Sequence, residues 1–476
     1  MKQSVSSGAM SLMASEGVFI LSNYLLHIGI ARYLGIEAYG IFGVLMSLYL
    51  LNRSFLNTGF PRAVSKFMAE KQSVSLIRTS LILQIIIALF FAFGYILFAP
   101  TIATWLHNPT LISDIRFLGI MVIPLALMAL YTGGYMNGLS QYQEQAFVKF
   151  AFPVLRVVLA ALFIILGMNI FGALLGMFIA SVICLLFCFP LVKFSKQNTT
   201  ESGTLFKLLS FAIPATIGAL ALTSLRNINV LFVQSILKDN LQTGLFTAAL
   251  TLSNIPYLII TAFPLALLPA ISSSYAAKDI ERTKNYIIKS LRYLLLLLLP
   301  ITALLSATAT DVLHIFYGAS YTGAGPVFVL LMISATFLAL FVTLSTVIDG
   351  IGKPMLVMSI TLFFIFLMIL LNFYFIPLYG LMGVAFSSFI TSFLAFCIVG
   401  SYVYYKFKVL LKMRSTINIV FASVIVFLLA YVLGFHSLYV FVTYFICGIV
   451  YLSCLFILRE ITPEDAQRAR KVFKFH

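Results

Sequence analysis

The sequence predicts an all-α integral membrane protein of about 14 transmembrane helices. We expect two six-helix lobes, related by a pseudo-two-fold axis along the membrane normal, and two extra C-terminal helices. Three observations predict this fold: an apolar composition, long apolar runs and an alternating distribution of Lys and Arg. Of 476 residues, 62% are hydrophobic and 9% are charged, whereas about a quarter of the residues in a soluble domain are charged.

Each predicted span is an apolar run of about 20 residues or more, which crosses a hydrocarbon core roughly 30 Å thick at 1.5 Å per residue. No connection between spans exceeds about 20 residues, so we expect the function to lie among the helices. The predicted spans are 10–33, 39–60, 80–106, 113–138, 146–168, 170–192, 208–237, 243–270, 291–316, 325–348, 354–376, 380–405, 415–434 and 436–458.

The basic residues give the orientation. Of the 30 Lys and Arg residues, 24 lie in every second gap, Lys149 among them, and the intervening gaps hold only Arg32, Arg116 and Lys238. Short cytoplasmic loops carry the excess of cations. We therefore expect a multi-pass protein of the cytoplasmic (inner) membrane with both termini cytoplasmic. The net charge of +16 is then a topology signal that faces anionic lipid, and no nucleic-acid partner is expected.

A weak internal repeat relates the first six spans to the next six. Residues 38–42 (AYGIF) open the second span and residues 242–246 (QTGLF) open the eighth. Parallel repeats of this kind occur in transporters whose two lobes rock about a central site. The predicted domains are an N-lobe at 1–206, a C-lobe at 207–407, and spans 13 and 14 with a cytoplasmic tail at 408–476. Glycines recur at separations of 204, 212 and 208 residues, in the pairs Gly40 and Gly244, Gly138 and Gly350, and Gly172 and Gly380.

When the cations assigned to the loops and span ends are set aside, three arginines remain inside the membrane: Arg53 in span 2, Arg156 in span 5 and Arg226 in span 7. An Arg at the centre of a membrane helix costs about 2.5–3.5 kcal/mol, so such residues usually face a cavity or a partner. The guanidinium group suits phosphate oxygens, and buried acids are scarce here, so we expect an anionic cargo. The alternative is that each Arg snorkels or caps helix carbonyls, which applies most to Arg53.

Polar residues at helical spacing accompany these arginines. Such stripes favour a cavity, although hydrogen bonds between packed helices also explain them. The stripes comprise Glu16, Asn23 and His27 in span 1, and Thr216, Thr223, Asn227 and Gln234 in span 7, and Asn57 follows Arg53 by one turn. The predicted substrate-binding residues are Arg53, Arg226, Arg156, Asn57, Asn227 and Asn23.

Two titratable residues of span 1 are candidates for coupling transport to an ion. Glu16 either takes part in proton or cation coupling or pairs with a nearby Arg, and His27 either titrates near neutral pH or packs. We expect no cofactor and no metal, because Cys184 and Cys188 share a helix face without His or carboxylate neighbours and suit a role as buried fillers. The sequence contains no HExxH, no GxSxG and no phosphate-cradling Gly-rich loop, so we predict no catalytic residues and no enzyme activity.

Residues 32–42 (RYLGIEAYGIF) carry a resemblance to a known family. They match the R-x-LG-x-x-x-YG-x-F pattern of the polysaccharide (lipid-linked oligosaccharide) flippases in the multidrug/oligosaccharidyl-lipid/polysaccharide exporter superfamily. Further similar segments are residues 59–61 (GFP), 66–70 (KFMAE), 317–321 (YGASY) and 350–353 (GIGK). The resemblance covers essentially the whole chain.

The resemblance implies alternating-access translocation of a polyprenyl-diphosphate-linked oligosaccharide across the cytoplasmic membrane, for cell-surface polysaccharide biosynthesis. It implies that cations in a cavity bind the diphosphate, a role that Arg53 and Arg226 match by residue type and helix, and we expect spans 1, 2, 7 and 8 to line that cavity. The expected partners are the lipid-linked glycan, membrane lipids and glycan-assembly enzymes, and the protein is expected to be a monomer.

Four other functions stay open. A cation-coupled multidrug exporter of the same fold would need acids in its cavity, and the sequence offers Glu16. A peptidoglycan-precursor (lipid II) flippase would be expected to carry more Arg in span 1 than this chain does. A scaffold without transport has no need of polar stripes, and a membrane glycosyltransferase would need larger loops.

Overall fold

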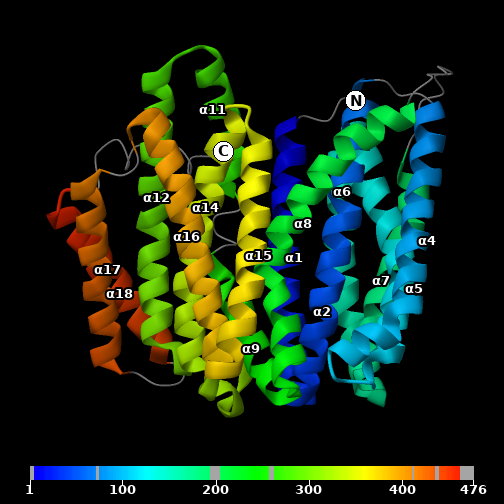
Figure 1. Ribbon diagram of the computed structural model, residues 1–476, viewed down its shortest axis with the longest axis horizontal. Coiled ribbons are helices and arrows are strands. Elements are labelled where there is room, and N and C mark those ends of the chain that lie inside the picture. Colours follow the sequence, from blue (N-terminus) through cyan, green and yellow to red (C-terminus); the bar gives the residue numbers. More distant parts are fainter. Residues whose placement is uncertain are drawn as a thin grey trace. The chain divides into compact units, whose positions relative to one another are not determined.

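The computed structural model describes residues 5–70, 74–192, 204–256, 262–409, 412–434 and 439–460, and all regular structure within them is helical (Figure 1). The first helices are α1 (Val5–Leu34), α2 (Ile36–Asn57), α3 (Gly59–Glu70), α4 (Val74–Trp105), α5 (Leu111–Ala129), the π-helix η1 (Leu130–Met136), α6 (Tyr142–Phe163), the π-helix η2 (Ile164–Met168), α7 (Asn169–Leu191), α8 (Thr204–Leu237) and α9 (Asn240–Ser253). They are followed by α11 (Ala262–Ala276), α12 (Ile280–Ala307), α13 (Ala309–Tyr317), the 3-10 helix η3 (Ala319–Ala324), α14 (Gly325–Gly350), α15 (Pro354–Tyr379), α16 (Leu381–Phe407), α17 (Met413–Leu433) and α18 (Val440–Ile457).

The helices confirm an all-α membrane protein. In the described residues, 12 helical segments are long and apolar enough to cross a membrane. One of them, Tyr142–Leu191, contains two predicted spans, because Gly167 (φ +87°) and Asn169 (φ +48°) end α6 and begin α7 with a reversal. The predicted span 243–270 includes residues outside the described part of the chain. A total of 14 spans therefore stays a prediction.

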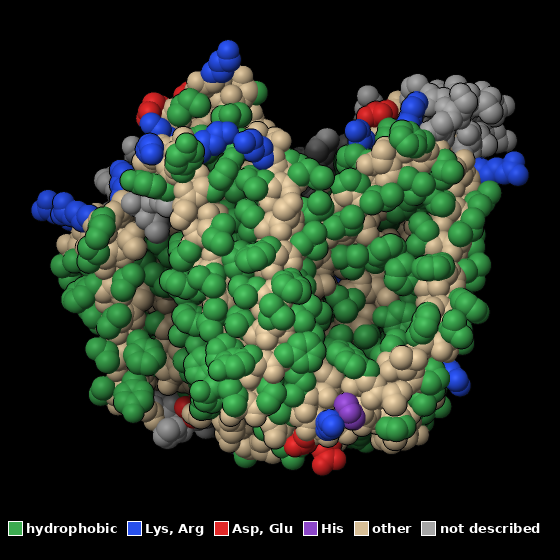
Figure 2. Space-filling view, in the orientation of Figure 1, with side chains coloured by type: hydrophobic (Ala, Val, Ile, Leu, Met, Phe, Trp, Pro, Cys, Tyr) green, Lys and Arg blue, Asp and Glu red, His purple; other side chains and the backbone are tan. Residues whose placement is uncertain are grey.

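Side chains on the outer faces of these helices suit a hydrocarbon environment. Figure 2 shows hydrophobic side chains over the flanks of the helices and Lys and Arg near helix ends. In α4, for example, Phe90 and Phe93 are 71% and 65% exposed. A soluble helix would bury such rings, whereas lipid solvates them at no cost.

The contacts divide the chain into two compact units, Met1–Thr247 and Ala248–His476. The first unit includes α8, which packs against α2 and α3, and the first turns of α9. This boundary differs from the predicted one at residue 206 because the packing of α8 groups it with α2 and α3. The lobes 1–206 and 207–407 and the segment 408–476 stay predictions from the repeat.

Within the first unit, residues of the predicted repeat make reciprocal contacts where α2 meets the start of α9. A Cβ atom at Gly40 would overlap the carbonyl oxygen of Asn240, and a Cβ at Gly244 would overlap the carbonyl oxygen of Ile36. Both pairs of equivalent residues are 204 apart, which is the separation found in the sequence. The contact is therefore locally two-fold symmetric, and it needs glycine at both positions for the helices to approach.

Candidate functional site: a cationic cavity in the first unit

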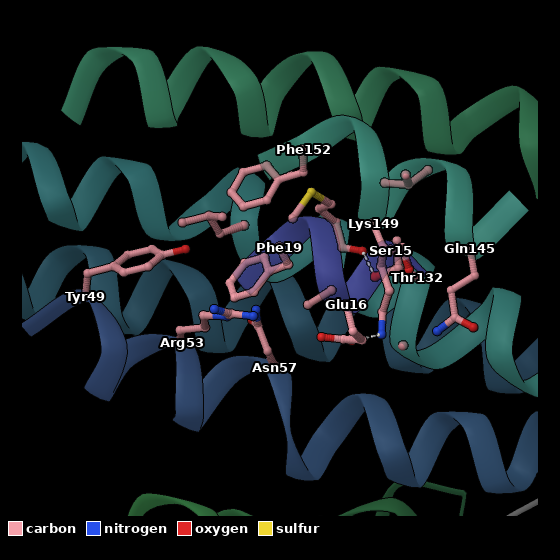
Figure 3. A pocket seen from close by; sticks show the side chains of 15 residues that line it. Ser15, Glu16, Phe19, Tyr49, Arg53, Asn57, Thr132, Gln145, Lys149 and Phe152 are labelled. Atoms are coloured by element: carbon pink, nitrogen blue, oxygen red, sulfur yellow. Dashed lines mark hydrogen bonds and ion pairs between the residues drawn. The ribbon is translucent and has the colours of Figure 1, made fainter. Parts of the chain in front are cut away.

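A cavity of about 220 Å³ opens among α1, α2, α5, η1 and α6 (Figure 3). These helices are neighbours because α1 packs on α6 and α2 packs on α5. The cavity therefore involves predicted spans 1, 2, 4 and 5, not the expected set of spans 1, 2, 7 and 8. The charged and amide side chains in its wall are Glu16, Arg53, Asn57, Gln145 and Lys149.

Arg53 lines this cavity from the last turns of α2. Its guanidinium carbon lies 4.5 Å from the ring centroid of Phe19 on α1, a cation–π arrangement. Within the described part of the chain, no carboxylate pairs with Arg53. Asn57 lines the same wall one turn later, and its buried Oδ1 atom has no hydrogen-bond partner among the described residues. The structure thus brings together an Arg and an Asn that were predicted to bind substrate.

Glu16 lines the same cavity from α1, and its partner corrects the prediction of a pair with Arg. Its Oε1 atom lies 2.7 Å from Nζ of Lys149 on α6 (Figure 3). The two side chains keep 57% and 36% of their exposure, so the pair borders the open side of the cavity. Lys149 is the partner because α6 packs along α1 at this level, whereas Arg156 lies two turns further along α6.

Arg156 is fully buried behind this cavity. One of its Nη atoms lies 3.5 Å from Oδ1 of Asn23, and its guanidinium carbon lies 5.4 Å from the ring centroid of Phe19. Its Nε atom has no hydrogen-bond partner, and no carboxylate pairs with it among the described residues. Arg53 and Arg156 therefore approach the same aromatic ring and repel one another electrostatically. Arg53 in the wall of the cavity and Arg156 behind it thus carry positive charges that no carboxylate of the described residues neutralises.

The polar stripe of α8 makes hydrogen bonds, which is the second of the two explanations that the sequence left open. Oγ1 of Thr223 donates to Oγ of Ser54 on α2 at 2.9 Å, and Gln234 donates to the carbonyl oxygen of Leu106 at 3.3 Å. Asn227 donates to the backbone carbonyl of Thr223 at 3.0 Å. Three members of the stripe thus serve hydrogen bonds within the helix or between packed helices, the alternative that membrane helices commonly use.

Neither Arg226 nor Asn227 is in the wall of the cavity around Arg53. Arg226 interacts electrostatically with Tyr24 on α1. Arg226 follows Thr223 by nearly one turn, and Thr223 hydrogen-bonds to Ser54, which is next to Arg53 in the sequence. Arg226 is therefore on the helix that packs beside Arg53, and its role in binding stays a prediction.

His27, the second coupling candidate, lies apart from Glu16 in a packed aromatic cluster. Its Nδ1 atom is 2.9 Å from the hydroxyl of Tyr39, and its ring meets the edge of Phe42 at a centroid distance of 5.3 Å. The side chain is 7% exposed. This environment is that of a buried packing residue with one polar partner.

The described residues contain no group of three or more His, Cys, Asp or Glu side chains that could hold a metal ion. Cys184 and Cys188 are both free and fully buried on α7, as expected of small fillers.

Sequence reasoning missed Lys149, Gln145 and Phe19 as parts of the site. Lys149 had been grouped with loop cations because it lies near the start of a predicted span. A signal was present nevertheless: Gln145, Lys149, Phe152 and Arg156 are spaced by four, three and four residues, so they share one face of α6. Phe19 carried no sequence signal, because a single aromatic residue in a membrane helix is common.

Known proteins resemble this chain in sequence and in fold. The profile of the family described as "Polysaccharide biosynthesis protein" matches residues 5–275, and that of the family described as "MatE" matches residues 214–374. An uncharacterised membrane protein of Methanocaldococcus jannaschii is 26% identical over 414 residues, which is 82% of this chain and 97% of that protein. The lipid II flippase MurJ of Bacillus subtilis is 24% identical over 455 residues, 82% of each chain.

A solved structure of a lipid II flippase MurJ in an inward closed conformation has the same fold. It matches with a TM-score of 0.77 at 16% identity, and covers 95% of this chain and 99% of that one. The family profile at residues 5–275 covers more than half of the 476 residues, and it begins in α1 and ends in α11. The chain therefore belongs to the polysaccharide biosynthesis protein family, within the multidrug/oligosaccharidyl-lipid/polysaccharide exporter superfamily of membrane transporters and flippases.

Proposed function

We propose that this protein is a flippase that moves a polyprenyl-diphosphate-linked oligosaccharide across the cytoplasmic (inner) membrane by alternating access, for cell-surface polysaccharide biosynthesis. Family membership and the membrane-spanning helices support the transporter class. The observation that supports an anionic substrate is the positive charge of the arginines at the cavity. Arg53 and the fully buried Arg156 both lack a carboxylate partner among the described residues. A cation held inside a membrane protein without a counter-charge is by default a candidate for a functional site.

We infer from the size of the cavity that it binds only one part of the substrate. Its volume of about 220 Å³ is below the about 300–1,000 Å³ of pockets for drug-sized ligands. It therefore suits the diphosphate and the first sugar, while the rest of the glycan follows an aqueous path and the prenyl chain stays in lipid. The guanidinium of Arg53 offers two parallel N–H donors to phosphate oxygens, and the unpaired amide oxygens of Asn57 and Gln145 accept from sugar hydroxyl groups.

The remaining predicted residues take supporting roles in this proposal. Asn23 orients the guanidinium of Arg156, whose charge adds to the potential of the cavity. Arg226 and Asn227, on α8, contact the diphosphate as it leaves the cavity. We also propose that the protein acts as a monomer, that both termini are cytoplasmic and that glycan-assembly enzymes supply the substrate. No chemical step is proposed, because transfer across the membrane makes and breaks no bond.

Reconstitution into vesicles tests this function. The purified protein is inserted into liposomes that contain a fluorescent polyprenyl-diphosphate oligosaccharide, and a membrane-impermeant quencher reports the fraction on the outer leaflet. We expect the Arg53→Ala, Arg226→Ala double variant to lose at least about tenfold in flipping rate, because each charge-assisted contact contributes about 1.5–3 kcal/mol. Arg282→Ala, at an exposed position of α12, is the matched control. Flipping by the double variant at the unaltered rate would exclude the proposal.

Two observations favour related substrates as second candidates. Similarity to the lipid II flippase MurJ favours a peptidoglycan precursor, and the MatE profile at residues 214–374 favours a cation-coupled multidrug exporter. The exporter requires acids for cationic drugs, but the lining of the cavity contains one acid, Glu16, and two cations, Arg53 and Lys149. The same vesicles loaded with lipid II or with a fluorescent cationic dye distinguish the three substrates.

A further inference from the structure

One of the side chains that line the cavity is itself an anion. Glu16 on α1 and Lys149 on α6 form an ion pair of 2.7 Å in the wall that also contains Arg53 (Figure 3). With this pair closed, Lys149 is occupied and the formal charge of the lining side chains is +1. With Glu16 turned away, the cavity presents two free cations.

The exposure of the pair shows that it can open. The side chain of Glu16 is 57% exposed and that of Lys149 is 36% exposed. Ion pairs with this degree of exposure gain little over separate hydration. The Glu16 carboxylate can therefore rotate toward the open side of the cavity without leaving a buried charge behind.

The amides beside the pair indicate a polar ligand. Gln145 lies one turn before Lys149 on α6, is 5% exposed, and its Oε1 atom has no hydrogen-bond partner among the described residues. Asn57, one turn after Arg53, has an unpartnered buried Oδ1. Buried amide oxygens in proteins are nearly always hydrogen-bonded. Each of the two cations in the wall thus has beside it an amide with unused hydrogen-bonding capacity.

We propose that Glu16 is a built-in counter-anion that the diphosphate of the substrate displaces from Lys149, so that Arg53 and Lys149 hold the diphosphate together. This inference rests on the proposed function and adds a second binding cation and an exchange step to it. A diphosphate diester carries one negative charge on each phosphate, which matches the two cations, Arg53 and the released Lys149. A neutral prenyl alcohol cannot displace a carboxylate, so the exchange also selects against lipids that lack the diphosphate.

A double-mutant cycle on binding tests the exchange. Farnesyl diphosphate is titrated into the purified full-length protein in detergent by calorimetry, with farnesol as the neutral control. Glu16→Gln is expected to tighten binding about two- to fivefold, because Lys149 is then free before the ligand arrives. Lys149→Met is expected to weaken binding at least about tenfold.

The decisive value is the effect of Glu16→Gln in the Lys149→Met background. Exchange predicts that the gain disappears there, because no ion pair remains to be broken. A gain that persists without Lys149 would mean that Glu16 acts only through its field, and it would overturn the proposal, as would a Glu16→Gln variant that binds no more tightly. Lys149→Arg keeps the charge and is expected to keep the coupling. If Lys149→Met does not fold, Lys149→Gln completes the cycle.

Two further measurements separate this inference from the proposed function. Glu281 and Lys284 on α12 form an exposed pair of the same 2.7 Å length, so Glu281→Gln is the matched control and is expected to leave the Kd unchanged. Arg53→Ala tests the site itself. Loss of binding in Arg53→Ala together with an additive cycle would reject only the exchange. Equal binding of farnesyl diphosphate and farnesol by the unaltered protein would reject the diphosphate site and the exchange with it.

Discussion

The crossing of α2 and α9 is the place where the smallest change should have a clear effect. Adding one methyl group, as Gly40→Ala or Gly244→Ala, puts a Cβ atom onto a backbone carbonyl oxygen of the facing segment. A backbone atom cannot rotate out of the way as a side chain does, so the two helices have to separate. We predict that each substitution destabilises the first unit.

The magnitude follows from two opposing terms. Alanine in a helix interior is favoured over glycine by roughly 0.5–1 kcal/mol, whereas overpacking a close contact costs about 1–3 kcal/mol. The difference is a net destabilisation of about 0–2.5 kcal/mol, centred on roughly 1 kcal/mol. Gly29→Ala provides the matched control, because Gly29 is in the helix α1 and a Cβ there meets no atom within 4 Å. That control should be neutral or slightly stabilising.

Thermal unfolding of the three single variants and of the Gly40→Ala, Gly244→Ala pair, measured in one detergent, provides the test. We expect both single variants to melt below the Gly29→Ala control. The pair should lose less than the sum of the single losses, because helices separated by the first methyl group already admit the second. If Gly40→Ala melts with Gly29→Ala, the close approach does not exist and the reasoning from the 204-residue repeat fails.

Three other predictions concern charged side chains. Phe19→Leu removes the ring that faces Arg53 at 4.5 Å; we expect about two- to tenfold weaker binding of farnesyl diphosphate from the lost cation–π contact, and an unchanged Kd would contradict it. Arg156→Met removes a fully buried charge without a carboxylate partner among the described residues, so the protein should melt at a higher temperature in detergent while flipping in vesicles slows. A higher melting temperature without loss of flipping would refute a functional role. In the second unit, Arg292 binds Glu460 through Nε at 2.9 Å, and the Glu460 side chain is 8% exposed. Arg292→Met should cost about 3–5 kcal/mol of stability, because a buried carboxylate is left unpaired, and adding Glu460→Gln should restore part of that loss in the same melting assay.

The fold could be predicted in large part because the membrane imposes it. Apolar runs and the side on which Lys and Arg gather are properties of the sequence alone, and they led to helices that the structure describes at nearly every predicted span. The spacing of Gly40 and Gly244 indicated a repeat, and the contact between the two copies was found only in the structure. The reversal at Gly167 falls where the sequence separates spans 146–168 and 170–192. The total of 14 spans stays a prediction because span 243–270 includes residues outside the described part of the chain.

The site was predictable only where a residue was out of place in lipid. Arg53, Asn57 and Glu16 are such residues, and all three line one cavity. The same logic failed for Thr223, because a hydroxyl group that faces a packed helix and one that faces water look alike in a sequence. It failed in the opposite direction for Lys149, because a cation near the start of a span is normally a topology signal.

Arg156 lies seven positions after Lys149 on the same face of α6, and this spacing could have identified Lys149 as part of the site. One cation near a helix end has an ordinary explanation in the cytoplasmic interface. Two cations two turns apart on one face do not have that explanation, because the second lies too deep to reach the headgroups. Both side chains must then face the same interior region of the protein. In a chain of this kind the face of the helix, read together with depth, therefore locates the binding cavity better than the identity of any single charged residue.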